Sequence, residues 1–351
     1  MKNALILLVV SISLAAPSTW AANSKFEAYT PDARLGTLCS HGAPFTYFAR
    51  KGWLPDGQRG LIVEFEGGGC CFSALTCALP QYTRSVDVSF ELSMLNSRGG
   101  IGSSTNTKNP VYGFDHLYVP YCTGDAHVGN KTASYGVHHF GRRNVKAALE
   151  WLKTNISVAP SVVFVTGGSA GSVASYVWAP WIFQMFPKSK HVHLGDSYAP
   201  LFGKSGYQGG LDNWDLLNAY LPSIKGIVQN KTWTPYVAAR DMVATAAAFP
   251  EAQFSSYVSD SDTVEEGFYL DEGCGADGCD WHEAFRTALK MSQAAPNFAS
   301  FVAAGYTHVV TESDEMYSKK AQGVAFSDWL TDMIAGRAAA KSLDCKNDGE
   351  C

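Results

Sequence analysis

The chain has 351 residues, of which 46% are hydrophobic and 17% charged, and its formal net charge at pH 7 is −5. This composition is typical of a globular protein, and the length suits one large α/β core at least as well as two smaller domains. The mild negative charge, without a dense run of Lys or Arg, argues against a nucleic-acid surface or a patch for anionic membranes.

The first 22 residues have the pattern of a secretory signal peptide. Lys2 precedes an apolar run over residues 4–16, and the small residues Ala21 and Ala22 follow as cleavage positions. The run is short for a bilayer span, and no later stretch approaches 18 uninterrupted apolar residues. We therefore expect a signal peptide over residues 1–22, a single domain over 23–351 without an integral membrane span, and export to the periplasm or the extracellular space.

All nine cysteines follow this signal, as is usual where disulfides form and persist. Close spacing predicts three disulfides: Cys274 with Cys279, Cys345 with Cys351, and Cys77 with either Cys70 or Cys71. The odd number leaves at least one thiol free or paired with another chain.

A zinc site at Cys122, His127, His138 and His139 is the alternative use of cysteine. It is disfavoured because close pairs of the CxxC type are missing and an oxidising compartment favours disulfides. We expect no bound metal.

The predicted elements alternate between strands and helices. Apolar runs predict buried strands at residues 61–65, 116–121, 161–165, 191–194 and 254–258. Helical spacing predicts a helix over residues 139–154, and a second helix opens near residue 173. This order predicts an α/β protein with a mostly parallel sheet and crossover helices. Residues 81–110 and 201–240 fit the sheet poorly and are expected to form a lid or a substrate wall.

The segment Gly167-x-Ser169-x-Gly171 lies between a predicted strand and a predicted helix. A serine on a tight strand-to-helix turn exposes its hydroxyl, and glycines two residues away on each side remove side chains that would collide. This pattern predicts a nucleophile at Ser169. The alternative is that Ser169 only caps the following helix.

Glu66 is followed by Gly67, Gly68 and Gly69, directly after the strand predicted at 61–65. Acyl transfer places negative charge on a carbonyl oxygen, which backbone N–H groups exposed by glycine can stabilise. Gly68 and Gly69 are therefore candidates for an oxyanion hole, together with the N–H of Ala170. The alternatives are an ordinary turn or a phosphate loop, but neither GxxxxGK[ST] nor GxGxxG occurs.

A serine nucleophile needs a histidine base, and the base needs an orienting carboxylate. The chain order expected for this turn is serine, acid, histidine. His191 and His193 come too early, and His282 belongs to a helical stretch where a solvated histidine is expected. His308 lies in a loop and is the predicted base.

The acid should close the strand before this histidine. Asp260 and Asp262 both follow the strand predicted at 254–258, and spacing alone does not separate them.

The sequence resembles the pectin acetylesterase and Notum family of serine esterases, in particular its bacterial secreted branch. The resemblance rests on these segments: residues 66–71 with Cys77; 119–125 with His127 and Gly129; His139, Gly141 and Asn144; 166–171; and 196–197. It implies an α/β-hydrolase-like catalytic domain over residues 23–351 and a triad that falls on Ser169 and His308. The family's acid motif resembles residues 262–269, which favours Asp262, and its oxyanion hole falls on Gly68, Gly69 and Ala170.

Two positions depart from the family. Plant and animal members usually carry an aromatic residue where this chain has Gly69 and Cys70, which leaves the acyl preference open. Glu265 replaces a glutamine and places a second carboxyl group near Asp262, where like-charge repulsion raises the pKa of one of the two.

We expect a secreted serine carboxylesterase that removes O-acyl groups, foremost acetyl, from a polysaccharide such as pectin. The chemistry requires no metal or organic cofactor. The first alternative is an esterase for lipid-like acyl chains or polyesters. The second is a binding protein on the same fold, disfavoured because nucleophile, acid and base candidates occur together.

Overall fold

The computed structural model describes residues 24–55, 58–229, 232–274, 279–337 and 340–351. The predicted signal peptide lies outside the described residues. Within the described ranges, no helix combines the length and the apolar character needed to cross a bilayer.

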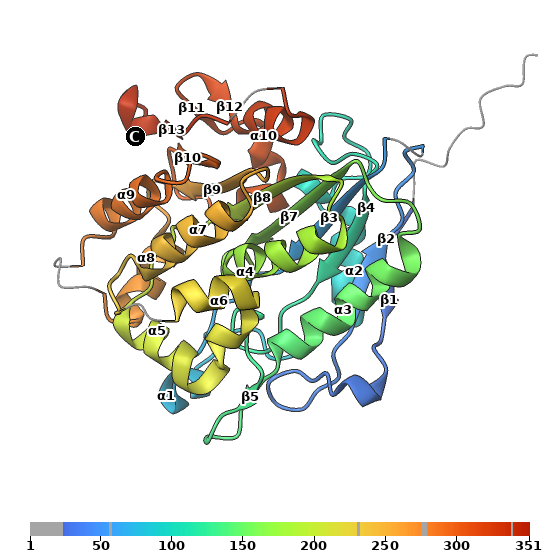
Figure 1. The fold of residues 1–351 in the computed structure, drawn as a ribbon, viewed down its shortest axis with the longest axis vertical. Coiled ribbons are helices and arrows are strands. Elements are labelled where there is room, and N and C mark those ends of the chain that lie inside the picture. Colours follow the sequence, from blue (N-terminus) through green and yellow to red (C-terminus); the bar gives the residue numbers. More distant parts are fainter. Residues whose placement is uncertain (1–23, 56–57, 230–231, 275–278, 338–339) are drawn as a thin grey trace, which may run out of the picture.

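A nine-stranded sheet forms the centre of the molecule (Figure 1). Its strands, in spatial order, are β1 (Glu27–Tyr29), β2 (Tyr47–Arg50), β4 (Asp115–Val119), β3 (Gly60–Phe65), β7 (Val162–Gly168), β8 (Lys190–Asp196), β9 (Phe254–Ser259), β10 (Phe298–Ala303) and β13 (Leu343–Asp344). The β1–β2 and β2–β4 pairs are antiparallel, and all other neighbours are parallel. Chain segments that follow the parallel strands therefore meet at one edge of the sheet.

Helices cover both faces of this sheet. They are α1 (Ala74–Ala78), α2 (Val88–Ser97), α3 (Gly141–Asn155), α4 (Ala170–Met185), α5 (Lys204–Gly209), α6 (Pro222–Val228), α7 (Val237–Ala248), α8 (Thr263–Asp271), α9 (Trp281–Ser292) and α10 (Phe326–Ala335). Figure 1 shows α3, α4 and α7 in front of the sheet. Two short hairpins, β5–β6 (Lys131–Thr132 and His138–His139) and β11–β12 (Lys320–Ala321 and Val324–Ala325), lie outside it.

The alternation of side chains along the strands creates two cores. On β3, Val63 and Phe65 belong to the cluster that includes α3, α4 and α7, whereas Ile62 belongs to the cluster that includes α10. Successive side chains of a strand point to opposite faces, so a strand with helices on both faces is apolar throughout. This explains why the central strands were recognisable as continuous apolar runs.

The predicted parallel sheet is confirmed, with strand ends that differ by a few residues. The helix predicted at 139–154 is α3, and the helix predicted from residue 173 begins earlier, at Ala170. The expectation for residues 81–110 was wrong in part: α2 packs near β1, and its Leu95 contacts a small core with Phe26 and Phe48. This helix therefore contributes to the core at the antiparallel edge of the sheet, and none of residues 81–110 lines the pocket around Ser169.

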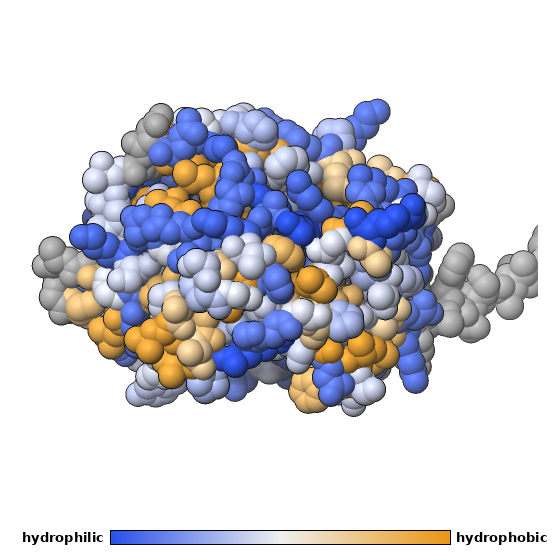
Figure 2. All heavy atoms as spheres, turned by 90° about the horizontal axis from the view of Figure 1, so that it is seen from below, coloured by the Kyte–Doolittle hydropathy of each residue, from blue (hydrophilic) through white to orange (hydrophobic). Residues whose placement is uncertain are grey.

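The face seen from below in Figure 1 is mostly polar, with apolar side chains in separate patches (Figure 2). Large exposed apolar side chains include Leu75 on α1, Leu79 directly after α1, and Phe90 on α2. Dispersed apolar side chains are common on protein surfaces. They require no functional explanation.

Candidate active site

Ser169 lies at the turn between β7 and α4, with φ 54° and ψ −121°. A positive φ is rare for a residue with a side chain and marks a strained turn. The side chain of Ser169 makes no capping hydrogen bond to α4, so the capping alternative is wrong. Ser169 instead lines the pocket described below.

The glycines on both sides of Ser169 are required by close backbone packing. A Cβ on Gly167 would lie 2.2 Å from the carbonyl oxygen of Gly171, and a Cβ on Gly171 would lie 2.0 Å from that of Phe65. Any side chain at these positions would therefore push the turn away from β3. This is the geometric reason that the sequence pattern predicted.

The glycine loop after β3 lies against Ser169 and needs glycine for the same reason. Gly68 and Gly69 have φ of 137° and 75°, and a Cβ on Gly69 would lie 2.0 Å from the carbonyl oxygen of Gln81. Within the described part of the chain, no backbone hydrogen bond involves the N–H groups of Gly68, Gly69 or Ala170 as donors. Gly69 and Ala170 also line the pocket. These N–H groups are therefore available to an oxyanion.

Residues 121–129 hold the glycine loop in place. The N–H of Cys71 donates to the carbonyl of Gly124 (2.9 Å), and Nε2 of His127 lies 2.8 Å from the carbonyl oxygen of Glu66. Burial lowers the pKa of His127 to about 4, so its neutral ring donates this hydrogen bond.

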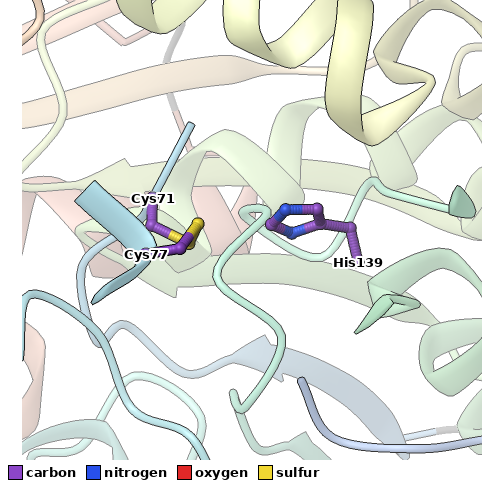
Figure 3. Close-up of side chains that lie close together, drawn as sticks. All are labelled: Cys71, Cys77 and His139. Carbon is purple, nitrogen blue, oxygen red and sulfur yellow. A yellow bond between two sulfur atoms is a disulfide. The ribbon is translucent and has the colours of Figure 1, made fainter. Parts of the chain in front are cut away.

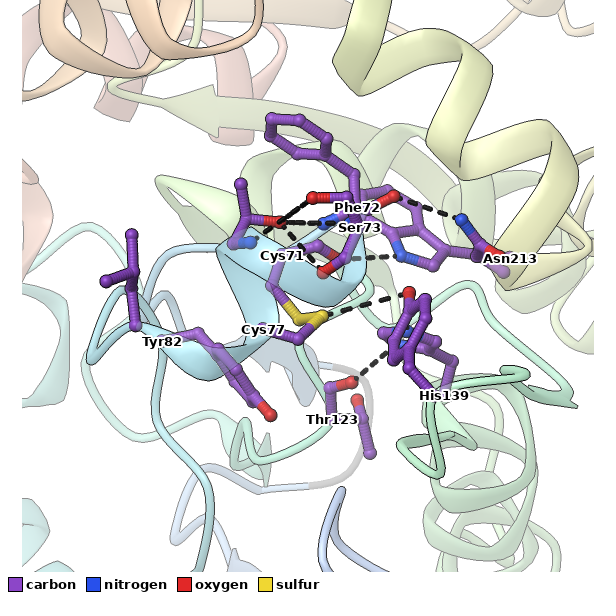
Figure 4. The surroundings of a disulfide bond; sticks show 12 residues. Cys71, Phe72, Ser73, Cys77, Tyr82, Thr123, His139 and Asn213 are labelled. Atoms are coloured by element: carbon purple, nitrogen blue, oxygen red, sulfur yellow. Dashed lines mark hydrogen bonds between the residues drawn. A yellow bond between two sulfur atoms is a disulfide. The ribbon is translucent and has the colours of Figure 1, made fainter.

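A disulfide between Cys71 and Cys77 ties the glycine loop to α1 (Figure 4). Trp214 Nε1 donates to the carbonyl of Cys71 (2.9 Å), and Asn213 donates to that of Phe72 (3.0 Å). These contacts connect the loop to residues of the 201–240 segment. The other disulfides join Cys39 to Cys122, Cys274 to Cys279 and Cys345 to Cys351, and Cys70 is free.

These pairs confirm the three expected disulfides and choose Cys71 over Cys70 as the partner of Cys77. The Cys39–Cys122 pair was not foreseen, because 83 residues separate its two cysteines. Its formation removes Cys122 from the zinc alternative.

Cys71, Cys77 and His139 place one ligand atom each within 4.8 Å of one another (Figure 3). The two sulfur atoms are joined, so neither is a thiolate, which is the form that binds a metal. Nδ1 of His139 lies 3.0 Å from the carbonyl oxygen of Thr123, and its Nε2 lies 3.1 Å from the hydroxyl of Tyr135. With the disulfide formed, these three side chains make a structural contact between α1 and β6.

His308 and Asp262 are hydrogen bonded to each other, with 2.8 Å between Nδ1 and Oδ2. Asp262 is completely buried and also caps α8, because its Oδ1 accepts the N–H groups of Val264 and Glu265. Asp260 is bonded instead to Arg286. Asp262, and not Asp260, is therefore the carboxylate bonded to His308, a choice that spacing alone left open.

The end of β8 positions both the serine turn and the histidine loop. The carbonyl of Asp196 accepts the N–H of Ser169 (2.9 Å), and its carboxylate accepts the N–H groups of Val310 (3.2 Å) and Thr311 (2.7 Å). Ser197 Oγ accepts the N–H of Val309 (2.7 Å). Sequence reasoning noted residues 196–197 only as part of the family resemblance; a carboxylate directly after a buried strand was the available signal.

Ser169 and His308 line one pocket at this edge of the sheet. Aromatic side chains form much of its wall: Tyr198, Phe202, Trp214, Phe268, Tyr269 and Trp281. Residues of the 201–240 segment therefore form part of the pocket wall, and their contact with a substrate stays a prediction.

Three further ionisable side chains lie in the pocket wall: Glu265, Glu272 and Cys70. Burial raises the pKa of Glu272 to about 8, and it also raises that of the Cys70 thiol. Burial, followed by the charge of Asp262, raises the pKa of Glu265 well above its ordinary value. Glu272 is therefore mainly neutral at pH 7. The sequence predicted a raised pKa for either Asp262 or Glu265. The raised pKa belongs to Glu265, and burial rather than the charge of Asp262 is its main cause.

The mostly parallel sheet, its two helical layers and the serine turn after a central strand define an α/β-hydrolase fold. A crystal structure of the Wnt deacylase Notum from Drosophila has the same fold, with a TM-score of 0.66 and 16% identity over 91% of this chain and 96% of that chain.

The pectinacetylesterase family matches residues 23–198, half of the chain, and the chain belongs to this family. Pectin acetylesterase 11 of Arabidopsis thaliana is 25% identical over 160 residues, which are 45% of this chain and 41% of that protein. Palmitoleoyl-protein carboxylesterase notum2 of Xenopus laevis is 26% identical over 137 residues, 38% of this chain and 27% of that protein. The matches thus span well under half of these relatives, and the family match ends before Asp262 and His308.

Proposed function

We propose that this protein is a serine carboxylesterase that removes O-acyl groups, foremost acetyl groups, from a polysaccharide such as pectin. The observation that carries the proposal is the shared pocket of Ser169 and His308, with Asp262 bonded to the far side of the imidazole. Membership in the pectinacetylesterase family supports the reaction class. Four disulfides support export to an oxidising compartment.

In this mechanism the hydroxyl of Ser169 attacks the ester carbonyl while Nε2 of His308 takes its proton. Asp262 accepts the Nδ1–H bond, fixes the tautomer and stabilises the imidazolium. The N–H groups of Gly68, Gly69 and Ala170 stabilise the oxyanion. His308 then protonates the departing alcohol, and water repeats the sequence to release the acid.

The test is hydrolysis of 4-nitrophenyl acetate by Ser169→Ala and His308→Ala, followed by acetate release from acetylated pectin. We expect each variant to lose at least about 10⁴-fold in kcat. Ser205→Ala and His282→Ala, at exposed positions outside the pocket, are the matched controls. Wild-type protein no faster than Ser169→Ala on every ester would overturn the proposal and leave a binding protein on this fold.

The second candidate is an esterase for lipid-like acyl chains or polyesters, favoured by the aromatic side chains of Phe202, Trp214 and Phe268 in the wall. Comparison of 4-nitrophenyl acetate, octanoate and palmitate separates the two. Higher kcat/KM on the long chains would support this candidate over the deacetylase.

A further inference from the structure

A second hollow of the surface, at the start of α3, is lined by cationic side chains. Arg34, Arg142, Arg143 and Lys146 line it together with Asn130, and we call these five residues the basic site. None of them lines the pocket of Ser169. The described wall of this hollow contains neither Asp nor Glu.

Only two of the four cations have an acidic partner. Arg142 donates to Oδ2 of Asp215 (2.5 Å), and Arg34 is paired with Asp32 (2.5 Å). Among the ion pairs of the described residues, Arg143 and Lys146 have no such partner. The basic site therefore keeps two uncompensated positive charges.

Arg143 is held in one position with part of its guanidinium free. Its Nε donates to Oδ1 of Asn130 (2.6 Å), and its guanidinium carbon lies 3.7 Å from the centroid of the Phe140 ring. Its two terminal nitrogens have no hydrogen-bond partner within the described residues, and both are accessible to solvent. A guanidinium fork matches the two oxygens of a carboxylate, and a side chain that is already fixed loses less freedom on binding.

Lys146 lies three residues after Arg143, on the same side of α3. Its side chain is exposed, and its Nζ lies 5.7 Å from the centroid of the Trp181 ring. The backbone at the start of the helix adds no free donor at its first two positions, because the N–H groups of Gly141 and Arg142 donate to Asp125 and Gly129. The side chains therefore supply the positive charge of the basic site.

Trp214 connects the basic site to the pocket of Ser169. It lines that pocket, and its carbonyl accepts the N–H of Asn130 (2.8 Å). The next residue, Asp215, is the partner of Arg142. Since α3 and α4 both begin where parallel strands have ended, the two sites lie at the same edge of the sheet. An extended chain can therefore contact both.

The two sites differ in charge. The described wall of the pocket of Ser169 has no Lys or Arg, and it carries Glu265 and Glu272. The whole chain has a formal net charge of −5. An anionic polymer is repelled by such a chain unless local cations hold it. The basic site provides these cations beside the active site.

We propose that the basic site is a subsite for a carboxylate group of an acidic polysaccharide, whose acyl ester occupies the pocket of Ser169. The fork of Arg143 bonds the carboxylate, and Lys146 adds a second positive charge. This inference rests on the proposed function for the choice of a polysaccharide. It narrows the substrate to polymers that contain uronic acid residues.

The test measures binding without hydrolysis, by isothermal titration calorimetry of the mature protein. The probe is an oligomer of galacturonate without acyl esters, and a galactose oligomer of the same length is its neutral counterpart. We expect binding of the charged oligomer alone. Arg143→Gln should raise its Kd by about tenfold or more, the scale of a charged hydrogen bond. Arg143→Lys keeps the charge without the fork, so its Kd should lie between those of wild type and Arg143→Gln.

Lys146→Gln should raise the Kd by about threefold, as expected for an exposed charge. Its matched control is Lys290→Gln, the same substitution at an exposed position on α9 outside both sites, which should leave the Kd unchanged. Equal effects of these two substitutions would overturn the inference, because they would show a general effect of net charge.

Three further outcomes would overturn the inference: no binding of the charged oligomer by wild-type protein, equal binding of the neutral oligomer, or an unchanged Kd in Arg143→Gln. Inorganic sulfate that competes as well as the oligomer at equal charge concentration would assign the basic site to small anions instead. Failure of the esterase proposal is distinguishable, because this assay needs no turnover and hydrolysis of 4-nitrophenyl acetate is measured separately.

Discussion

Glu64 and Glu272 are both buried carboxyl groups, yet they carry opposite protonation states at pH 7. Burial by itself raises the pKa of each. For Glu64, the charge of Arg98 and the bond to His116 outweigh burial and lower the pKa to about 2. For Glu272, the single bond from Gly203 does not outweigh burial, and the pKa is about 8. The partners, rather than the depth of burial, decide the charge.

The two groups also differ in where they lie. Glu64 is on β3, on the face away from α4, where Arg98 and the neutral ring of His116 (2.7 Å) satisfy it within the fold. Glu272 and Glu265 lie on the wall of the pocket, where no cation is bonded to either among the described residues. Glu64 is thus charged within the scaffold, whereas Glu272, in the pocket wall, is mainly neutral at pH 7.

The first prediction concerns Asp262, the buried carboxylate that is hydrogen bonded to His308. Asp262→Asn should lower kcat on 4-nitrophenyl acetate by about 10⁴-fold, because an asparagine does not hold the imidazole in the required tautomer or stabilise its charged form. Asp260→Asn, at the neighbouring carboxylate paired with Arg286, is the matched control and should change kcat by less than about threefold. A larger loss in Asp260→Asn than in Asp262→Asn would reverse the assignment of the acid.

The second prediction concerns Arg98, the cation paired with the buried carboxylate of Glu64. Arg98→Met should destabilise the protein by about 3–5 kcal/mol, because it leaves the carboxylate of Glu64 buried without its charged partner. The measurement is urea unfolding at pH 7 with the disulfides intact. Adding Glu64→Gln should recover part of the loss. A loss below about 1 kcal/mol, typical of an exposed ion pair, would show that the buried charge needs no partner.

Much of this arrangement was predictable because it follows local patterns. The strands with helices on both faces are continuous apolar runs, and the glycines around Ser169 follow from one tight turn. The edge strands β1 and β2 were not predicted, because such short antiparallel strands lack a distinct run. Spacing alone could not separate Asp260 from Asp262, and only the family resemblance favoured Asp262, since Asp260 is engaged by Arg286, which lies in a helix elsewhere in the chain.

The pocket carboxyl groups were the least predictable feature. The family resemblance marked Glu265 as a departure, but no local pattern predicted the bond of its Oε2 to the N–H of Ala199, 66 residues earlier. Glu272 gave no signal, because its burial depends on the close approach of α5. A Cβ on Gly203 or Gly206 would lie 2.4 Å from atoms of Glu272. Long-range packing of this kind leaves no periodic pattern.

The last prediction tests the comparison through the pH dependence of stability. The folded pKa of Glu272 is raised from 4.5 to about 8, so the folded state binds the proton more tightly and stability falls as pH rises between these values. The slope is about 1.4 kcal/mol per pH unit for one group. Glu272→Gln should therefore gain in stability relative to wild type as pH rises, until the difference levels off near the folded pKa. Urea unfolding at several pH values from 4 to 9, the flanks of this interval, gives the difference curve.

Glu64→Gln provides the opposite case in the same experiment. The folded pKa of Glu64 is lowered to about 2, so its contribution is present above the ordinary value of 4.5 and is lost as pH falls through the folded value. The Glu64→Gln difference curve should hence be flat where the Glu272→Gln curve rises, and should bend only in acid. Two curves that bend in the same pH range would contradict the view that partners decide the charge, because burial is common to both groups.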